Sequence, residues 1–270
     1  MAEPAVRFEK EGHIATVTLN RPEVRNAINA EMLCRLADAW QAIVDDPEIR
    51  VAILTGAGEE AFCAGADLDR LVRMMQGLRP PEDEFDERIQ KDYSLIWKGL
   101  LREFDVYKPI VAAVKGFCVA GGVELLQCTD IRVASEDAQF GLAEVKWSLF
   151  PMAGSTVRLP RQIPYCMAME ILLTGERMSA AEAYRIGLVN RVVPRDRVLP
   201  EARRFAEILA ENGPLAVQAV KRSVLEGSGR PIREALAKEF EIGAQVALSQ
   251  DAKEGTRAFK EKRKPVFQGR

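Results

Sequence analysis

The chain has 270 residues, of which 47% are hydrophobic and 29% are charged, and its net charge is −2 at pH 7. A chain of this length and composition can bury one large hydrophobic core, and its near-neutral charge gives no reason to expect binding to nucleic acid or to an acidic membrane surface. Its five cysteines form no Cys-x-x-Cys pair, so we expect a reducing compartment and no structural metal. No apolar run approaches the ~18 residues of a membrane span, and the start resembles neither a signal nor a transit peptide, so the cytoplasm is the expected location.

The first elements are strands and one long helix. Residues 6–9 and 14–19 alternate like a hairpin of half-buried strands. Asn29 is a plausible cap for a helix that runs to about residue 44, because apolar residues recur in it at spacings of three and four. Residues 51–55 form the next buried strand.

Two loops and a helix follow this strand. Residues 62–68 form a small-residue loop that leads into a helix. Residues 77–85 hold two prolines and several acids, and their composition predicts the least ordered part of the chain. A helix over about residues 88–104 then returns to the centre of the predicted sheet.

The stretch from residue 109 to residue 144 carries the chemistry. A buried parallel strand at 110–114 is followed by a glycine-rich turn and by a helix that begins near Glu124. The unpaired N–H groups at such a helix start can stabilise an oxygen that becomes negative during a reaction. Glu144 lies twenty residues further on, beyond a second strand at 131–134. Taken alone, Glu124 could be a dipole-stabilised helix carboxylate and Glu144 a surface acid.

The remaining elements become entirely helical near residue 197. Helices over 165–174 and 179–186 and a short strand at 189–193 complete a mixed α/β core at residues 1–196. Residues 197–270 hold only helical patterns, with apolar stripes that need a surface to pack on. We therefore predict a C-terminal helical region used for oligomerisation.

Seven blocks, in order and along nearly the whole chain, resemble the crotonase superfamily of acyl-CoA enzymes, the enoyl-CoA hydratases and isomerases. The blocks are LNRPEVRNAI (19–28), VAILTGAGEEAFCAGADL (51–68), KPIVAAVKGFCVAGGVEL (108–125), DIRVASEDAQFGLAE (130–144), FPMAGSTVRLPR (150–161), LLTGERMSAAEAYRIGLVNRVV (172–193) and AFKEKRK (258–264). The resemblance implies an α/β fold built as a spiral of ββα units.

The resemblance also implies roles for individual residues. The backbone N–H groups of Ala66 and Gly121 match the oxyanion-hole donors, and Glu124 and Glu144 match the two glutamates that hydratases use on the catalytic water. Residues that match contacts to coenzyme A (CoA) are Arg25, Ala27, Ala64, Asp67, Leu68, Phe259 and Lys262, the last two from a neighbouring subunit in some members. Residues expected at the acyl pocket are Leu71, Met75 and Met152.

The sequence departs from the usual hydratase pattern in two places. Ala120 stands where many hydratases have the first of three glycines, and we expect little effect because the donor position keeps its glycine. Residues 151–155 read Pro-Met-Ala-Gly-Ser in place of Pro-Gly-Ala-Gly-Gly. Met152 thus places a flexible apolar side chain near the expected position of the attacking water.

The implied function is that of an enoyl-CoA hydratase in fatty acid β-oxidation, which adds water across the 2,3 double bond of a 2-enoyl-CoA to give a 3-hydroxyacyl-CoA. CoA belongs to the substrate, no other cofactor or metal is expected, and the implied assembly is a trimer or a dimer of trimers. One alternative is an isomerase or a dehydratase for a specialised 3-hydroxyacyl-CoA. Another is an acyl-CoA-binding or RNA-binding relative without hydratase activity, because residues 253–264 carry six cations. Two glutamates among these cations indicate instead a solvated helix face.

Overall fold

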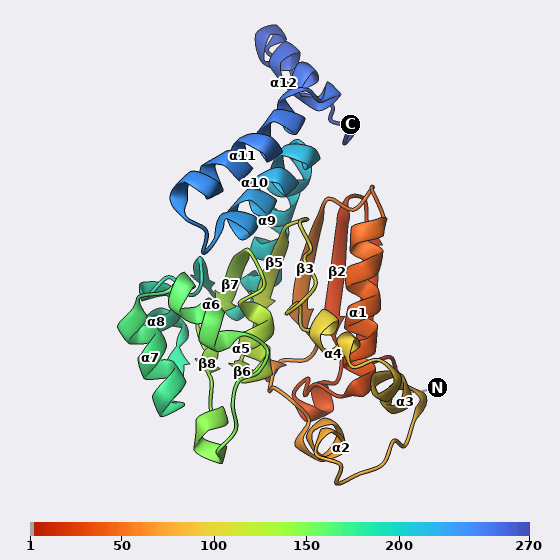
Figure 1. Cartoon of the computed structure of the whole chain (residues 1–270), viewed down its shortest axis with the longest axis vertical. Helices are drawn as coiled ribbons and strands as arrows, with labels where there is room; N and C mark the ends of the chain where they lie inside the picture. The colour runs from red at the N-terminus through yellow and green to blue at the C-terminus, as the bar shows by residue number, and fades with distance from the viewer. Residues whose placement is uncertain (1–2) are drawn as a thin grey trace.

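The computed structural model describes residues 3–270 as two β-sheets surrounded by helices (Figure 1). The larger sheet has the strand order β1-β2-β3-β5-β7-β10, and the smaller sheet has the order β4-β6-β8-β9. The larger sheet is made of β1 (Val6–Glu11), β2 (Ile14–Leu19), β3 (Val51–Gly56), β5 (Ile110–Val114), β7 (Ile131–Ser135) and β10 (Arg191–Val193). The smaller sheet is made of β4 (Ala61–Cys63), β6 (Phe117–Val119), β8 (Gln139–Gly141) and β9 (Met178–Ser179). Apart from the β1-β2 and β8-β9 pairs, neighbouring strands run parallel.

Consecutive strands alternate between the two sheets. After β3, β5 and β7 in the larger sheet, the chain adds β4, β6 and β8 to the smaller sheet. A helical segment follows each of these pairs: η2 (Leu68–Val72), α5 (Gly121–Leu126) and η3 (Glu144–Trp147). The predicted spiral of ββα units is therefore confirmed. Because β4, β6 and β8 are parallel, the loops that follow them meet at one edge of the smaller sheet.

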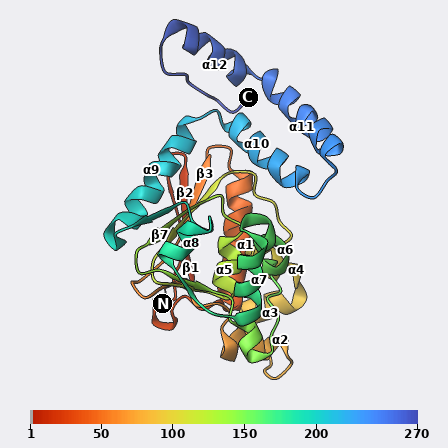
Figure 2. The same cartoon turned by 90° about the vertical axis from the view of Figure 1, so that its left-hand side faces the viewer.

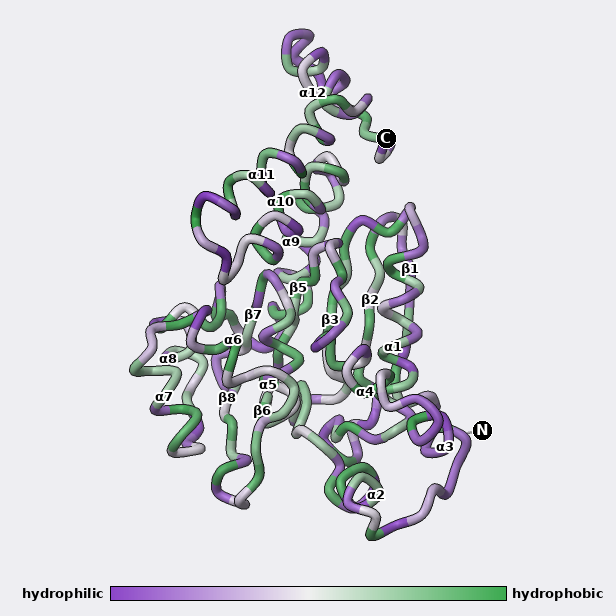
Figure 3. Tube along the Cα trace, viewed as in Figure 1, coloured by the Kyte–Doolittle hydropathy of each residue, from purple (hydrophilic) through white to green (hydrophobic). Residues whose placement is uncertain are grey.

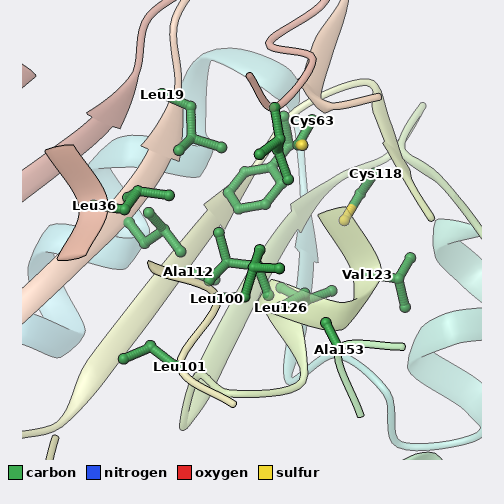
Figure 4. Close-up of a cluster of buried hydrophobic side chains, with 14 of the residues drawn as sticks. Leu19, Leu36, Cys63, Leu100, Leu101, Ala112, Cys118, Val123, Leu126 and Ala153 are labelled. Atoms are coloured by element: carbon green, nitrogen blue, oxygen red, sulfur yellow. The ribbon is translucent and has the colours of Figure 1, made fainter. Parts of the chain in front are cut away.

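The main hydrophobic core joins the larger sheet to α1 (Ala30–Asp45), α3 (Glu84–Lys91), α4 (Ser94–Gly99) and α5. The Asn29 side chain accepts a hydrogen bond from the Met32 N–H group, which confirms the predicted cap of α1. Trp40 is fully buried in this core, and its indole N–H group donates to the Gly99 carbonyl at 2.9 Å. Figure 4 shows side chains of α5 in contact with the same core, so the helix that carries Glu124 is anchored firmly.

The predicted helix over residues 88–104 is wrong in its bounds, because the structure has two shorter helices, α3 and α4. Asp92 separates them by taking an extended conformation, and its side chain accepts a hydrogen bond from the Ser94 N–H group at 2.9 Å. Ion pairs organise the segment before α3. Arg79 pairs with the nearly fully buried Asp86 at 2.6 Å, and Arg70 pairs with Asp83 at 2.8 Å. A charge network thus holds a segment whose composition offers little apolar surface to bury.

Helices α6 (Ser155–Gln162), α7 (Tyr165–Thr174) and α8 (Ala180–Arg185) lie beside the smaller sheet (Figure 1). The Ser179 hydroxyl accepts a hydrogen bond from the Glu182 N–H group and so caps α8. Within residues 3–270, no helix is long and apolar enough to cross a membrane, and no group of three or more histidine, cysteine, aspartate and glutamate side chains could hold a metal ion.

The chain ends in four helices, α9 (Val198–Glu211), α10 (Pro214–Gly227), α11 (Ile232–Ala247) and α12 (Gln250–Glu261). Helix α9 covers the larger sheet, because its buried Val198, Ala202 and Ala206 pack against strand residues. Helices α11 and α12 stand away from both sheets (Figures 1 and 2). Figure 3 shows hydrophobic and hydrophilic residues mixed along α10 and α11, whereas β5, in the interior of the larger sheet, is hydrophobic.

Candidate active site

Two backbone N–H groups come together at the carboxyl edge of the smaller sheet. Ala66 lies in the loop after β4, and Gly121 is the first residue of α5, directly after β6. A Cβ atom placed on Gly121 would lie 3.8 Å from the Ala66 nitrogen. In the part of the chain that the structure describes, neither N–H group has a hydrogen-bond acceptor. Two adjacent unpaired donors can bind an anionic oxygen.

Glycines allow the two loops to approach this closely. A Cβ atom on Gly65 would lie 2.7 Å from the Ala120 Cβ atom, and Gly65 has a φ angle of +91°. A Cβ atom on Gly122 would lie 2.6 Å from the Cys63 carbonyl oxygen. The Ala66 loop is also tied to Ile28, whose N–H group donates to the Gly65 carbonyl at 2.8 Å. The pair of donors therefore depends on backbone packing that larger residues would prevent.

Ala120 adopts a backbone conformation that non-glycine residues rarely take, with φ = 50° and ψ = −124°. Its carbonyl accepts hydrogen bonds from the N–H groups of Val123 and Glu124 at 2.9 and 3.1 Å, and its own N–H group donates to the Gly141 carbonyl at 2.8 Å. These bonds hold Ala120 in a strained state. The donor position is still a glycine, Gly121, as the sequence showed. The strained backbone of Ala120, just before it, lowers the stability of the fold.

Two carboxyl groups follow the same edge of the smaller sheet, because Glu124 comes after β6 and Glu144 after the neighbouring β8. Glu124, on the first turn of α5, is buried with an exposed fraction of 5%, and its Oε1 atom accepts a hydrogen bond from the Ser155 N–H group at 3.4 Å. Glu144 opens η3 and is half-buried, and its Oε2 atom has no hydrogen-bond partner among residues 3–270. Burial and the charge of Glu144 raise the pKa of Glu124 to about 7, and burial raises the pKa of Glu144. Such a pair can hold one proton near neutral pH.

The residues that match CoA contacts in the first half of the chain lie together on one surface. The Ala64 N–H group donates to the Arg25 carbonyl at 3.0 Å, and the Asp67 N–H group donates to the Ile28 carbonyl at 2.9 Å. Arg25 is exposed and pairs with Glu60 at 2.8 Å, while Leu68 is 62% exposed.

Arg21 is a member of this surface that the motif reading missed. Its guanidinium donates to the Ala27 carbonyl at 2.6 Å and to the Asp67 carboxylate at 3.0 Å. Asp67 also accepts the Arg70 N–H group at 3.0 Å and so caps η2. Asp67 therefore holds the loop in place. The only sequence feature that could have pointed to Arg21 is the Arg-Pro pair at residues 21–22.

Phe259 and Lys262 are not part of the same site within one chain. Both belong to the end of α12, which lies at the opposite end of the molecule from α2 (Arg73–Met75) (Figure 1). The Phe259 side chain is 85% exposed.

The three residues expected at the acyl pocket differ in exposure. Leu71 is packed into the main core, whereas Met75 and Met152 are 45% and 58% exposed. Two aromatic residues that the sequence reading did not single out, Trp147 and Phe150, also expose their side chains in the segment after Glu144. An apolar, solvent-facing segment thus adjoins the carboxyl pair.

Comparisons with known proteins agree on one family. The family described as enoyl-CoA hydratase/isomerase matches residues 9–270. The chain is 48% identical over 267 residues to enoyl-CoA hydratase EchA19 of Mycobacterium tuberculosis, covering 99% of this chain and 97% of that protein. It is 39% identical to (E)-benzylidenesuccinyl-CoA hydratase of Thauera aromatica, covering 98% and 99% of the two chains. A crystal structure of enoyl-CoA hydratase from Mycobacterium tuberculosis H37Rv superposes with a TM-score of 0.86 at 38% identity, covering 99% of this chain and 100% of that one.

The raised pKa of Glu124 makes the stability of the fold depend on pH. Folding shifts this pKa from 4.5 to about 7. The contribution of Glu124 to the free energy of unfolding is therefore complete below about pH 4.5, and it is lost as the pH rises through about 7. The side chain of the Glu124→Gln variant stays neutral at every pH. The free energy of unfolding of the variant should therefore rise relative to that of the wild type, by up to ~3 kcal/mol between about pH 5 and pH 8. Urea unfolding at several pH values checks this, with the exposed Glu9→Gln as the control. A difference that does not change with pH contradicts it.

Proposed function

Because the chain belongs to the enoyl-CoA hydratase/isomerase family, we propose that its carboxyl pair and its two unpaired N–H groups catalyse the hydration of a 2-enoyl-CoA. The reaction is that of an enoyl-CoA hydratase, a hydro-lyase that forms a 3-hydroxyacyl-CoA. The observation that carries the proposal is the coupled pair of carboxyl groups, Glu124 and Glu144, which follow the neighbouring strands β6 and β8 at the same edge of the sheet as the N–H groups of Ala66 and Gly121. The reaction needs no cofactor beyond the CoA moiety of its substrate, and a role in fatty acid β-oxidation in the cytoplasm stays a prediction.

The two N–H groups stabilise the charge that develops on the thioester oxygen. As water attacks C3, electron density moves through C2 to this oxygen, which accepts hydrogen bonds from Ala66 and Gly121. Backbone donors are already oriented and need no rearrangement when the charge appears. Loss of one such donor typically raises a barrier by ~3–4 kcal/mol.

The carboxyl pair moves the two protons. One ionised carboxylate accepts a proton from water, and the other, protonated carboxyl donates a proton to C2. The family resemblance assigns water to Glu124 and C2 to Glu144. In the free protein the pKa of Glu124 is raised to about 7, so this carboxyl also holds a proton well. A bound thioester would exclude water from the half-exposed Glu144 and raise its pKa further, which is the direction that its assigned role requires.

The exposed methionines point to a substrate with a sizeable acyl group. We assign Met75 and Met152 to the walls of the acyl site, with Trp147 and Phe150 beyond them, because these apolar side chains are exposed and three of them lie in the segment that follows Glu144. The related Thauera aromatica protein is named for a benzylidenesuccinyl thioester, which is bulky. Acyl chains longer than four carbons should therefore fit.

The charges of α12 argue against the alternative of RNA binding. Arg257 and Arg263 both pair with Glu254, and Arg263 also pairs with Glu261. Lys264 also pairs with Glu211 at 3.6 Å. Three of the six cations of residues 253–264 are thus paired with carboxylates, which weakens the attraction of this segment for a polyanion. The presence of two carboxyl groups likewise favours hydration over isomerisation. A double-bond shift can use one group that carries a proton from C2 to C4, whereas hydration takes a proton from water and delivers a proton to C2, which suits two groups.

The proposed assembly is a trimer or a dimer of trimers, formed through α10 and α11. A cavity of about 450 Å³ between these helices is lined mainly by small and apolar residues, among them Ala219, Val220, Val224, Ile242 and Val246. Val220 and Val224 are 65% and 67% exposed. Apolar surface of this kind is typical of an interface between subunits. In such an assembly, Phe259 and Lys262 of one chain would lie near the CoA bound by another.

Replacing either Glu124 or Glu144 with glutamine should lower the rate of crotonyl-CoA hydration by ~10²–10⁴-fold, because each change removes a proton-transfer group at constant size. Circular dichroism and CoA binding should stay as in the wild type. Glu136→Gln, an exposed change after β7, serves as the control. A glutamine variant that keeps more than about a tenth of the wild-type rate would refute the two-carboxyl mechanism.

Replacing Met152 with glycine should reduce kcat/KM more for decenoyl-CoA than for hexenoyl-CoA, and least for crotonyl-CoA. The reason is lost apolar contact, worth ~0.8 kcal/mol for each buried methylene group. Met152→Ala separates this effect from the added backbone freedom of glycine. An equal change for all three substrates shows that Met152 does not contact the acyl chain.

Light scattering of the full-length chain should give a mass of three or six subunits. Val220→Asp places a carboxylate in the α10-α11 groove and should shift the mass towards that of a monomer. Val44→Asp, which adds the same charge to the exposed face of α1, should leave the mass unchanged. A monomeric wild type rules out the proposed assembly.

A further inference from the structure

Two buried polar side chains join α5 to α6 directly behind Glu124. We propose that Gln127 and Ser155 are positioning residues that hold the Ser155 N–H group against the Glu124 carboxyl. The inference rests on the proposed function because it takes Glu124 to be a catalytic residue. It goes further by giving a task to two residues that contact neither the substrate nor the reacting water.

The bond between the two side chains fixes the start of α6. The Gln127 amide group donates from Nε2 to the Ser155 hydroxyl at 2.8 Å, and both residues are buried, with exposed fractions of 3% and 0%. Ser155 is the first residue of α6, and its N–H group donates to Glu124 Oε1 at 3.4 Å. This distance is already long for an N–H···O bond, so a small outward shift of α6 would break it.

Gln127 also holds the other end of α6. Its backbone carbonyl accepts a hydrogen bond from the Gln162 side chain at 2.8 Å, and Gln162 is the last residue of α6. The Gln162 side-chain oxygen in turn accepts from Arg132 at 2.9 Å, and Arg132 donates to the Leu188 carbonyl at 3.0 Å. One residue, three positions after Glu124, therefore binds both ends of the helix that faces Glu124.

The hydrogen-bonded pair of Gln127 and Ser155 lowers the stability of the fold, because it leaves a buried polar atom without a partner. The Gln127 Oε1 atom is buried and has no hydrogen-bond partner within the described residues. An apolar side chain of similar size would avoid this cost and would still pack, but it could not hold Ser155. The charged and titratable groups around Glu124 are Glu144 on η3, Arg158 on α6 and Cys128 just after α5.

The test compares Ser155→Ala, Gln127→Met and the double variant with the wild type. Each single change should lower kcat about tenfold and leave KM within about twofold, because the carboxyl is displaced but the substrate contacts remain. The pH profile of kcat should move about half a unit to higher pH, because a weakened N–H bond favours the ionised carboxylate less. The double variant should be no worse than either single one, because both changes remove the same bond.

Ser135→Ala is the matched control, since Ser135 is a fully buried serine at the end of β7 whose hydroxyl forms no hydrogen bond with either glutamate in the described part of the chain. It should not move the pH profile. An unmoved profile in Ser155→Ala, or kcat losses that add in the double variant, overturns the proposal even when the variants are less stable. If Gln127→Met does not fold, the pH profile of Ser155→Ala decides.

Infrared titration of the Glu124 carboxyl group provides a second measurement. Its infrared band is identified as the one that disappears in the Glu124→Gln variant. Ser155→Ala should raise this pKa by about half a unit even if the wild type hydrates no acyl-CoA. An inactive wild type would then refute the proposed function alone, whereas an unchanged titration would refute the positioning role.

Discussion

The close approach of the loop after β4 to the turn after β6 is the constraint on which the rest of the site depends. Gly65 and Ala120 touch with no space for another carbon atom, and this contact sets Ala66 beside Gly121. The same turn starts α5, whose first turn carries Glu124. A single backbone packing event therefore places two N–H donors and one carboxyl group, and the alternation of strands between the two sheets makes the event possible.

This arrangement is unfavourable in several ways at once. Ala120 holds a conformation that costs ~1–3 kcal/mol, and two carboxyl groups are partly removed from water. Two N–H groups also lack acceptors among residues 3–270. The surrounding core, which includes Phe62, Cys118 and Leu125, has no such defects and offsets the cost. Strain and unpaired polar groups collect where a substrate oxygen and water would relieve them.

Sequence reasoning found the parts of the site that lie close together along the chain. The strand, the glycine-rich turn and the first helical turn with Glu124 are continuous in sequence, and so are Asn29 and its helix. The contacts that it missed join distant residues. Gln127 meets Ser155 across 28 positions, and Arg21 meets Asp67 across 46. Neither pair leaves a periodic signal, and the only local one is the Arg-Pro step at residues 21–22, because a lone glutamine or arginine has the same pattern on a surface as in a buried network.

Hydrogen bonds within the chain fix the direction of its last helix, α12. Arg50, before β3, donates to the carbonyls of Ala210 and Phe267 at 3.0 and 2.7 Å, and so ties the last residues to the far end of the larger sheet. The buried Asp251 carboxylate accepts the N–H groups of Gln268 and Gly269, both at 2.8 Å, which fixes those residues against the start of α12. The direction of α12 is thus set within one chain, away from that chain's own carboxyl pair. A contact from Phe259 to a bound CoA would therefore need the second subunit of the proposed assembly, in which occupancy of the site and association of the chains would stabilise each other.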